Sequence, residues 1–428
     1  MERSNTEYIL ESIGTGKQYV DSGWMLDAPD EKPDSLLRAI YKDTKLNLRD
    51  DAEGLFRYAG WLPMKGHLKG SASPVTYKSE GLASVLGLNN LWITFNGYWP
   101  EKGANMTTCS FKETEAYSVC SRLKGHEAKV LVVASAGNTA RAFAKVCSEN
   151  NIPLLLCVPY DYIDALWFQN ELSDCVKLVT TAAGSDYFDA IALSNIISKM
   201  EGFTAEGGAK NIARRDGMGT TVLNSVSTIG RIPEFYFQAV GSGTGAIAAW
   251  EANMRLIGDG RYGHNKMRLI VSQNAPFLPI YDSWKAGSRD ILSLDDDLAR
   301  KQSQEIDAKV LSNRKPPYSI KGGLFDALTD TDGDVHKVTN EELRAAARLF
   351  RDSEGIDIYS ASAVATSSLI QAVNSGLVNC NSLIMLNITG GGEYLFKSMY
   401  KPVYLKPNLS FSIHESEEVI REKVRELF

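Results

Sequence analysis

The chain has few residues of the types that build disulfide frameworks and metal centres. Its 428 residues include six cysteines and five histidines. The cysteines are spread out, form no C-x-x-C pair and lie mostly in apolar runs, which is typical of buried reduced thiols in a cytosolic protein. The histidines, which show no metal-ligand spacing, are His67, His126, His264, His336 and His414. We therefore expect no disulfide framework and no metal site.

Long hydrophobic runs and a strong charge of one sign are also lacking. The longest apolar runs, such as residues 152–158, are far too short to span a bilayer. The first residues are polar and carry no apolar region of the signal-peptide kind. The net charge of -6 is modest, whereas nucleic-acid binding usually needs a basic face. The sequence thus predicts a soluble cytoplasmic protein that binds small molecules, with no nucleic acid and no membrane as partner.

What the chain does have is an alternation of short apolar runs and helix-like stretches. This pattern is typical of βαβ units and predicts an α/β fold with a parallel sheet. An Ala-rich helix is expected at about residues 140–149. The clearest predicted strands are residues 130–134, 153–158, 176–179, 235–240, 268–271 and 383–388.

Two regions interrupt the alternation and suggest domain boundaries. Residues 1–70 are more polar and are predicted to be an N-terminal extension, and residues 276–326 are predicted to be irregular, with a covering loop. The resulting organisation has a large cofactor-binding domain (71–124 and 236–405), a small α/β domain (125–235) and a C-terminal helical tail (406–428). Thr339 and Glu342 form a capping-box pattern that predicts a helix ending near Arg351.

The first candidate for chemistry is Lys112, in the segment Thr108-Cys109-Ser110-Phe111-Lys112-Glu113. A lysine that forms an imine must be rigidly placed and partly desolvated, so that its amine loses a proton near neutral pH. A lone lysine is most often a surface charge. The interpretation of Lys112 therefore depends on the other motifs.

Two more candidates follow predicted strands, where ligands bind in open α/β sheets. Residues 135–139 (Ser-Ala-Gly-Asn-Thr) contain Asn138, which can donate to a phenolate oxygen, and their amides can receive a carboxylate at a helix N-terminus. Thr389 opens the run Thr-Gly-Gly-Gly, and its hydroxyl can hydrogen-bond a ring nitrogen without protonating it. Each is also compatible with a simple strand-end turn.

The fourth candidate is a glycine loop between a strand and a helix, where backbone N–H groups can converge on a phosphate. It is not a Walker A loop, because no Gly-Lys-Ser/Thr follows, and it is not a G-x-G-x-x-G fingerprint, because Ala246 stands where the third glycine would be needed. A plain glycine turn is the other interpretation. The loop consists of Gly241, Ser242, Gly243, Thr244 and Gly245.

The order of these four motifs resembles the β-family (fold type II) of pyridoxal-phosphate enzymes, which includes threonine synthase, cysteine synthase and serine/threonine dehydratases. The likeness extends over nearly all of the chain from about Leu36. Two positions depart from the threonine synthase pattern: Cys109 stands in place of a glycine, and Glu113 in place of an aspartate. The matching stretches include residues 97–104, 108–113, 135–144, 206–215, 236–245, 313–319 and 330–333.

The resemblance implies a fold of two open, twisted, mostly parallel sheets flanked by helices, and pyridoxal 5'-phosphate as the cofactor. It implies that Lys112 forms the imine with the cofactor, that Asn138 contacts its ring hydroxyl and that Thr389 lies at its pyridine nitrogen. By the same likeness the glycine loop cradles the cofactor phosphate. Family members associate, so a homo-oligomer is expected.

Within the family, the closest likeness is to members that replace the phosphate of O-phospho-L-serine with sulfite, giving L-cysteate through an aminoacrylate, in coenzyme M biosynthesis. Leaving group and nucleophile are both anions, so cations are expected beside them. The predicted substrate-binding residues are Ser135, Thr139, Arg141, Lys210, Arg214 and Arg215.

Several alternatives remain open. The chain could act on phosphohomoserine as a threonine synthase, or use O-phosphoserine to make cysteine. A catalytically silent pyridoxal-phosphate-binding regulatory protein is an alternative of a different class. A nucleotide-binding module built on the glycine loop is disfavoured, because no matching lysine or ribose-binding pattern is present.

Overall fold

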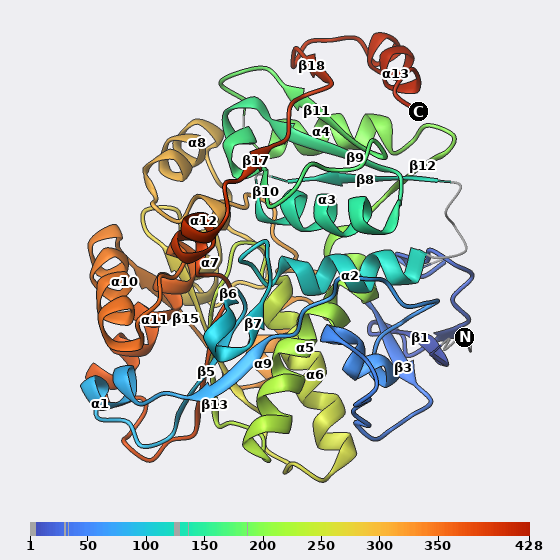
Figure 1. The fold of residues 1–428 in the computed structure, drawn as a ribbon. Coiled ribbons are helices and arrows are strands. Elements are labelled where there is room, and N and C mark those ends of the chain that lie inside the picture. The colour runs from blue at the N-terminus through green and yellow to red at the C-terminus, as the bar shows by residue number, and fades with distance from the viewer. Residues whose placement is uncertain (1–5, 30, 33, 124–128, 136, 186) are drawn as a thin grey trace.

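The computed structural model describes residues 6–428 except 30, 33, 124–128, 136 and 186. Its larger sheet has six strands in the order β15-β14-β13-β16-β5-β4 (Figure 1), and all neighbouring pairs are parallel except β4 with β5. These strands are mostly apolar and buried, as expected for a parallel sheet covered on both faces. Their bounds are β4 (Val75–Lys78), β5 (Leu91–Phe95), β13 (Phe235–Ala239), β14 (Arg268–Asn274), β15 (Asp334–Val338) and β16 (Ile384–Ile388).

The second sheet has five strands in the order β12-β8-β9-β11-β18, and all of its pairs are parallel. All six strands predicted from the sequence are present in the two sheets, with ends that differ from the prediction by at most three residues. The predicted α/β class is therefore confirmed. The bounds of the second sheet are β8 (Val130–Ala134), β9 (Leu154–Pro159), β11 (Val176–Thr181), β12 (Phe203–Ala205) and β18 (Leu409–Phe411).

Helices cover both sheets (Figure 1). In the large sheet, α11 packs on β13 and β14 with α10 outside it, while α5 packs on β4 and β5 beside α2 and α6. In the small sheet, α3 and α4 both pack on β9, and α3 also contacts α2. The bounds are α2 (Lys112–Leu123), α3 (Asn138–Asn150), α4 (Tyr187–Ile197), α5 (Ile212–Ile229), α6 (Thr244–Asp259), α10 (Asn340–Glu354) and α11 (Ser360–Asn374).

The start of α10 confirms the predicted capping box. The Thr339 side chain accepts a hydrogen bond from the N–H of Glu342, whose carboxylate accepts one from the N–H of Thr339. The helix ends at Glu354 rather than near Arg351. The predicted domain boundaries stay predictions, although α5 lies within the predicted small domain and packs against α2 and α6.

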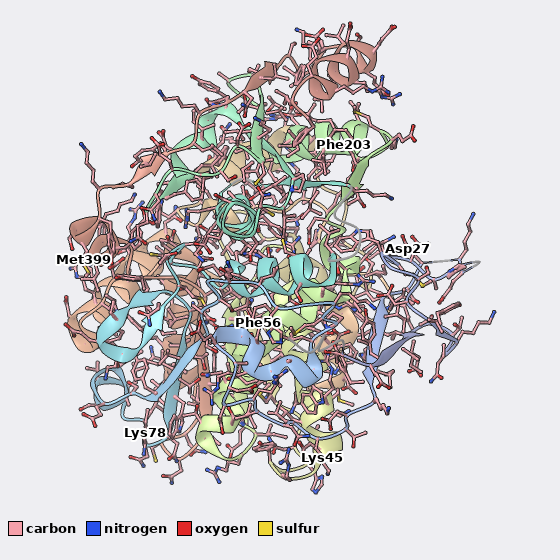
Figure 2. All side chains as sticks on the ribbon, turned by 45° about the vertical axis from the view of Figure 1, so that its right-hand side comes forward. Asp27, Lys45, Phe56, Lys78, Phe203 and Met399 are labelled. Carbon is pink, nitrogen blue, oxygen red and sulfur yellow. The ribbon has the colours of Figure 1, made fainter. Side chains whose placement is uncertain are left out.

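The N-terminal residues form an antiparallel sheet in the order β2-β1-β3, followed by the 3-10 helix η1 (Gly54–Trp61). This segment is part of the core, because Leu10, Leu36 and Phe56 are all at most 2% exposed and belong to the largest hydrophobic cluster. Phe56 is labelled among the packed side chains of Figure 2. The sheet strands are β1 (Tyr8–Ser12), β2 (Gln18–Tyr19) and β3 (Leu37–Tyr41).

Two predictions need correction. Residues 276–326 were expected to be irregular, but they contain α7 (Pro279–Lys285) and α8 (Asp296–Glu305). The α8 helix is capped by Asp295, whose side chain accepts a hydrogen bond from Leu298 N–H. This N-cap is a local sequence pattern, but it stands among other aspartates and is not distinctive in the sequence. The predicted helical tail begins with a strand, since β18 joins the small sheet before helix α13 (Glu417–Arg425) packs on α4.

None of the helices that the structure describes is long and apolar enough to cross a membrane. The carboxyl ends of β8, β13 and β16 all open toward the space between the two sheets, which is where ligands bind in open α/β folds. The remaining elements include α1 (Gly81–Leu86), β10 (Trp167–Phe168), α9 (Leu324–Asp330), α12 (Glu393–Met399) and β17 (Val403–Tyr404).

Candidate active site

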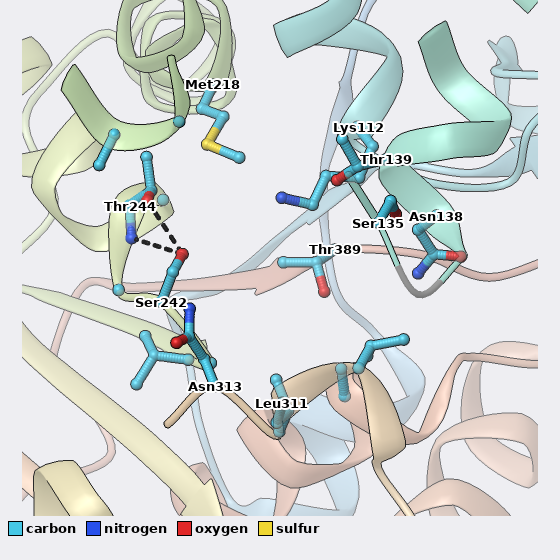
Figure 3. Close-up of a pocket in the computed structure, with 18 of the residues that line it drawn as sticks. Lys112, Ser135, Asn138, Thr139, Met218, Ser242, Thr244, Leu311, Asn313 and Thr389 are labelled. Atoms are coloured by element: carbon cyan, nitrogen blue, oxygen red, sulfur yellow. Dashed lines mark hydrogen bonds between the residues drawn. The ribbon is translucent and has the colours of Figure 1, made fainter. Parts of the chain in front are cut away.

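A cavity of about 530 Å³ lies between the two sheets (Figure 3), a volume within the usual range for small-molecule sites. All four sequence motifs line it. Arg141 and Arg215 were predicted to bind substrate but are not among its lining residues. The predicted residues that do line the cavity are Lys112, Ser135, Asn138, Thr139, Lys210, Arg214, the glycine loop (residues 241–245) and Thr389.

Lys112 is the first residue of α2, and its position is fixed by backbone pairing with the Thr389 segment. Phe111 N–H donates to Thr389 O at 3.0 Å, and Gly391 N–H donates to Cys109 O at 3.1 Å. Cys109 has a φ of +53°, in the left-handed region that favours glycine. Cys109 therefore holds, without being glycine, a backbone conformation that glycine adopts more easily.

The side chain of Lys112 points into the cavity, between the glycine loop and Thr389 (Figure 3), and is 19% exposed. Its Nζ donates to Glu115 Oε2 at 3.1 Å. Burial lowers the pKa of the Lys112 amine, and the negative charge of Glu115 opposes that shift. The amine is thus both partly desolvated and held in place, the two conditions that an imine-forming lysine needs.

Asn138 is the first residue of α3, and its amide orientation is set by Arg141. Arg141 Nη2 donates to Asn138 Oδ1 at 2.9 Å, so the Nδ2 group is the end of the amide that is free to face the cavity (Figure 3). Ser135 Oγ accepts from Gly137 N–H at 3.1 Å and closes the same turn. The N-terminal amides of α3 are directed toward this end of the cavity, where they favour an anionic group.

Arg141 itself cannot serve as the predicted substrate ligand. Arg141 is 2% exposed, and its guanidinium carbon lies 4.2 Å from the centroid of the Trp167 ring. It donates to Thr108 O, Ala165 O, Asn138 Oδ1 and Tyr359 Oη at 2.7–3.1 Å. Because every nitrogen has a protein acceptor, its role is to join the segments around the cavity.

The glycine loop runs from the end of β13 into α6, with backbone amides and two hydroxyls facing the cavity. Side chains are excluded by close packing: a Cβ on Gly243 would lie 2.7 Å from Leu324, and one on Gly245 would lie 2.5 Å from the Gln238 amide. Gly243 has a φ of +79°. Ser242 Oγ and Thr244 Oγ1 lie 2.9 Å apart (Figure 3). A cradle of this kind at the start of a 16-residue helix suits a phosphate.

Thr389 follows β16 and is 8% exposed. Its Oγ1 lies 3.4 Å from Ser362 Oγ, and Ser362 in turn donates to Gly390 O at 2.9 Å. The Thr389 hydroxyl, with that of Ser362 behind it, therefore lies at this end of the cavity, and no carboxylate is among the described residues that line the cavity. Such a pair of hydroxyls can hydrogen-bond a ring nitrogen but does not hold a proton on it.

The other predicted cations are paired with carboxylates. Arg214 donates to both oxygens of Glu115 at 3.1–3.2 Å and to Glu206 at 2.6 Å. Lys210 contacts Asp27, and it lies 3.0 Å from Asp34. Arg214 and Lys210 line the cavity but share their charge with these carboxylates.

Arg215 lies away from the cavity. Its side chain is fully buried, and it bonds to Glu251 at 2.9 Å and to the carbonyls of Leu37 and Ala209. Its role is to tie β3 and α6 together. The predicted substrate contact of Arg215 is therefore wrong, because a side chain placed on a helix by sequence alone can face either way.

Sequence reasoning missed several residues in or next to the cavity. Glu115 does not line the cavity but contacts Lys112 Nζ. It lies three residues after Lys112 on a helix, a spacing that brings side chains together and could have identified it. Tyr359, Gln238, Asn313 and Lys315 do line the cavity and come from elements whose approach depends on tertiary packing. Among the described residues, no group of three His, Cys, Asp or Glu side chains could hold a metal ion.

The donor set fits pyridoxal phosphate. The glycine loop, in which an added Cβ would clash with Leu324 or Gln238, suits a phosphate. The Lys112 amine faces the same cavity, and Asn138 and Thr389 offer neutral polar groups there (Figure 3). A cavity of this volume can hold both the cofactor and a small amino acid.

Comparison with known proteins agrees with the fold and the site. The family model described as pyridoxal-phosphate dependent enzyme matches residues 89–390. Among solved structures, maize serine racemase superposes with a TM-score of 0.57 at 14% identity, covering 77% of this chain and 92% of that one. Threonine deaminase isoform 2 from Solanum lycopersicum gives 0.54 at 18% identity, covering 76% and 86%. These similarities show a fold type II pyridoxal-phosphate enzyme.

Curated relatives are far more similar in sequence. The cysteate synthase of Methanosarcina acetivorans is 47% identical over 406 residues, which is 95% of this chain and 97% of that protein. The cysteate synthase of Methanocella paludicola is 50% identical over 374 residues, covering 86% and 87%. The chain belongs to the cysteate synthase family of pyridoxal-phosphate dependent enzymes.

Proposed function

We propose that this protein replaces the phosphate of O-phospho-L-serine with sulfite, forming L-cysteate and releasing phosphate. The observation that carries the proposal is that Lys112, Asn138, the glycine loop and Thr389 line a single cavity in a chain 47% identical to a cysteate synthase. A place in coenzyme M biosynthesis, a cytoplasmic location and a homo-oligomeric state belong to the same proposal.

Pyridoxal phosphate, held through Lys112, would supply the electron sink that makes the Cα proton of a bound amino acid acidic. The amine of Lys112, once free, takes that proton as general base and later returns it. The glycine loop would hold the cofactor phosphate, and Asn138 Nδ2 would donate to the ring hydroxyl. Thr389 leaves the ring nitrogen neutral, which favours prompt loss of the β-phosphate over transamination.

The substrate carboxylate is assigned to the start of α3, where backbone amides and the hydroxyls of Ser135 and Thr139 are available. The phosphate and sulfite need a separate cationic region. Lys315 is the candidate for that region, since it lines the cavity. Lys315 is exposed, and its Nζ lies 5.0 Å from the centroid of the Phe188 ring. Lys210 can contribute only after loosening its contacts with Asp27 and Asp34.

The test is a substrate and nucleophile matrix with the purified cofactor-loaded protein. O-phosphoserine and phosphohomoserine are each incubated with sulfite, with sulfide or with neither, and amino-acid products and phosphate are quantified. We expect cysteate and phosphate in equal amounts from O-phosphoserine and sulfite. Threonine from phosphohomoserine, or cysteine formed faster than cysteate, would replace this proposal with a neighbouring activity. No turnover in any arm would favour a binding protein.

A further inference from the structure

Glu115 is a fully buried carboxylate that touches the amine of Lys112. Its side chain has 0% exposure, and its Oε2 lies 3.1 Å from Lys112 Nζ. An unpaired charge in such a place is strongly disfavoured, so each of its contacts matters. The i,i+3 spacing on α2 means that the two side chains belong to the same helix face.

The same carboxylate also accepts hydrogen bonds from Arg214. Arg214 Nε and Nη2 donate to the two Glu115 oxygens at 3.2 and 3.1 Å, and Nη1 donates to Glu206 at 2.6 Å. Glu206 also accepts from Gly208 N–H at 3.0 Å. Glu115 is therefore held in one orientation whether or not Lys112 is beside it.

The charges of this group decide what it can do. One guanidinium and two ionised carboxylates (+1 − 2) give a net charge of −1, which complements an ammonium group and repels a phosphate or sulfite. Arg214 was expected to bind these anions, but its positive charge is already neutralised. The group faces Lys112 instead.

We propose that Glu115, oriented by Arg214 and Glu206, is a positioning residue that receives the Lys112 amine whenever it is not attached to the cofactor and stabilises its protonated form. This inference rests on the proposed cofactor attachment and base role of Lys112, and Glu115 is the residue that supports Lys112 as a base. When the lone pair of Nζ takes the Cα proton, the C–H electron pair stays on the substrate and the nitrogen becomes an ammonium. Glu115 stabilises that ammonium, and the reverse transfer regenerates the neutral amine.

Three charged groups act on the amine of Lys112: Glu115 from α2, Arg214 from α5 and Glu206, which follows β12. Tyr187, at the start of α4, lines the same cavity and interacts with Arg214. Burial raises the pKa of Glu206, and the positive charge of Arg214 opposes that shift. Among the residues that the structure describes, Glu115 is the one of these groups that accepts a hydrogen bond from Nζ.

The test uses the full chain stripped of cofactor and needs no substrate. Attachment of pyridoxal phosphate to Lys112 is followed by absorption, and its rate is measured against pH, since only the neutral amine reacts. The direction of the shift in the pH midpoint follows from charge, because removing the anion beside an amine lowers the pKa of the amine. We expect Glu115→Gln to move the midpoint of the rate profile down by about one pH unit or more, and Glu115→Asp to give an intermediate midpoint.

Glu113→Gln is the matched control. Glu113 is equally buried, in the same first turn of α2, but it faces Lys145 at 3.5 Å rather than Lys112. Its variant is expected to keep the midpoint of the unsubstituted protein. If Glu115→Gln does not fold, Glu115→Asp carries the test, because it keeps a charge for Arg214 while withdrawing it from Nζ.

The inference is supported by a downward shift in the Glu115 variants that exceeds the shift in Glu113→Gln. It is overturned if the folded Glu115 variants keep the original midpoint, or if Glu113→Gln shifts it equally. A protein that shows the shift but makes no cysteate would contradict the proposed reaction alone, so the two failures are distinguishable.

Discussion

Arg141 Nη2 donates a hydrogen bond to Asn138 Oδ1 at 2.9 Å, one helical turn along α3. This contact determines which end of the Asn138 amide faces the cavity. An asparagine whose oxygen is occupied presents its Nδ2 as a donor, and a ring oxygen is the group that a donor at this position would meet. Arg141 thus acts on the cavity through Asn138, although it does not line the cavity itself.

The first prediction concerns Arg141. Lysine at this position offers one nitrogen where the guanidinium supplies five hydrogen bonds, so Asn138 loses its fixed orientation. We expect Arg141→Lys to weaken pyridoxal phosphate binding by about tenfold and to lower the free energy of unfolding by roughly 2–3 kcal/mol. Absorption titration and chemical denaturation measure these two effects.

Arg215→Lys provides the matched control for that experiment. Arg215 is equally buried and also bonds to two backbone carbonyls, but away from the cavity. This variant should lose comparable stability while keeping the cofactor affinity. Equal losses of affinity in both variants would show that Arg141 acts only through general stability.

The second prediction concerns the glycine loop. Gly243 and Gly260 have the same φ of +79° and lie at opposite ends of α6. Alanine at either position costs about 1–2 kcal/mol for the left-handed backbone. At Gly243, however, the new Cβ would lie 2.7 Å from Leu324, whereas at Gly260 the nearest atom is 3.9 Å away.

We therefore expect Gly243→Ala to reduce the affinity for pyridoxal phosphate by about tenfold or more, because the loop must shift and its amides lose their convergence. Gly260→Ala should affect stability alone. The affinities of the two variants for pyridoxal phosphate are compared by titration at one temperature. An unchanged affinity in Gly243→Ala would argue against a phosphate in this loop.

The third prediction concerns Thr389. An aspartate there would hold a proton on the ring nitrogen and strengthen electron withdrawal, which stabilises a carbanion and slows β-elimination relative to transamination. We expect Thr389→Asp to make less cysteate and to form keto acid, whereas Thr389→Ser keeps the original products. Mass spectrometry of the products measures the ratio of cysteate to keto acid. An unchanged ratio in Thr389→Asp would contradict the role assigned to the Thr389 hydroxyl.

A fourth prediction tests the packing of the thiols. Burial raises the pKa values of Cys109, Cys147 and Cys157 well above the usual range, and Cys380 is exposed. In the folded protein iodoacetamide should modify Cys380 and leave those three thiols unmodified until denaturant is added. Peptide mass mapping reads out each thiol, and rapid labelling of Cys109 would contradict the tight turn before Lys112.

Local patterns predicted the parts of the molecule that depend on short stretches of chain. The β13 strand and the loop after it follow from an apolar run ending in glycines, and the α10 capping box follows from Thr339 and Glu342. Helix-face direction could not be predicted, which is why Arg141 and Arg215 were assigned to substrate although their guanidinium groups are held by carbonyls and carboxylates. Long-range packing could not be predicted either: Tyr359 lines the site where its N–H donates to Gly390 O, next to the contact between Phe111 N–H and Thr389 O.

The most direct measurement is sodium borohydride reduction of the protein loaded with pyridoxal phosphate, followed by peptide mapping. We expect the reduced cofactor on the peptide that contains Lys112, with loss of both the label and cysteate formation in Lys112→Ala. A label on a different lysine, or no label on a protein that still makes cysteate, would contradict the assignment of Lys112 as the residue that holds the cofactor.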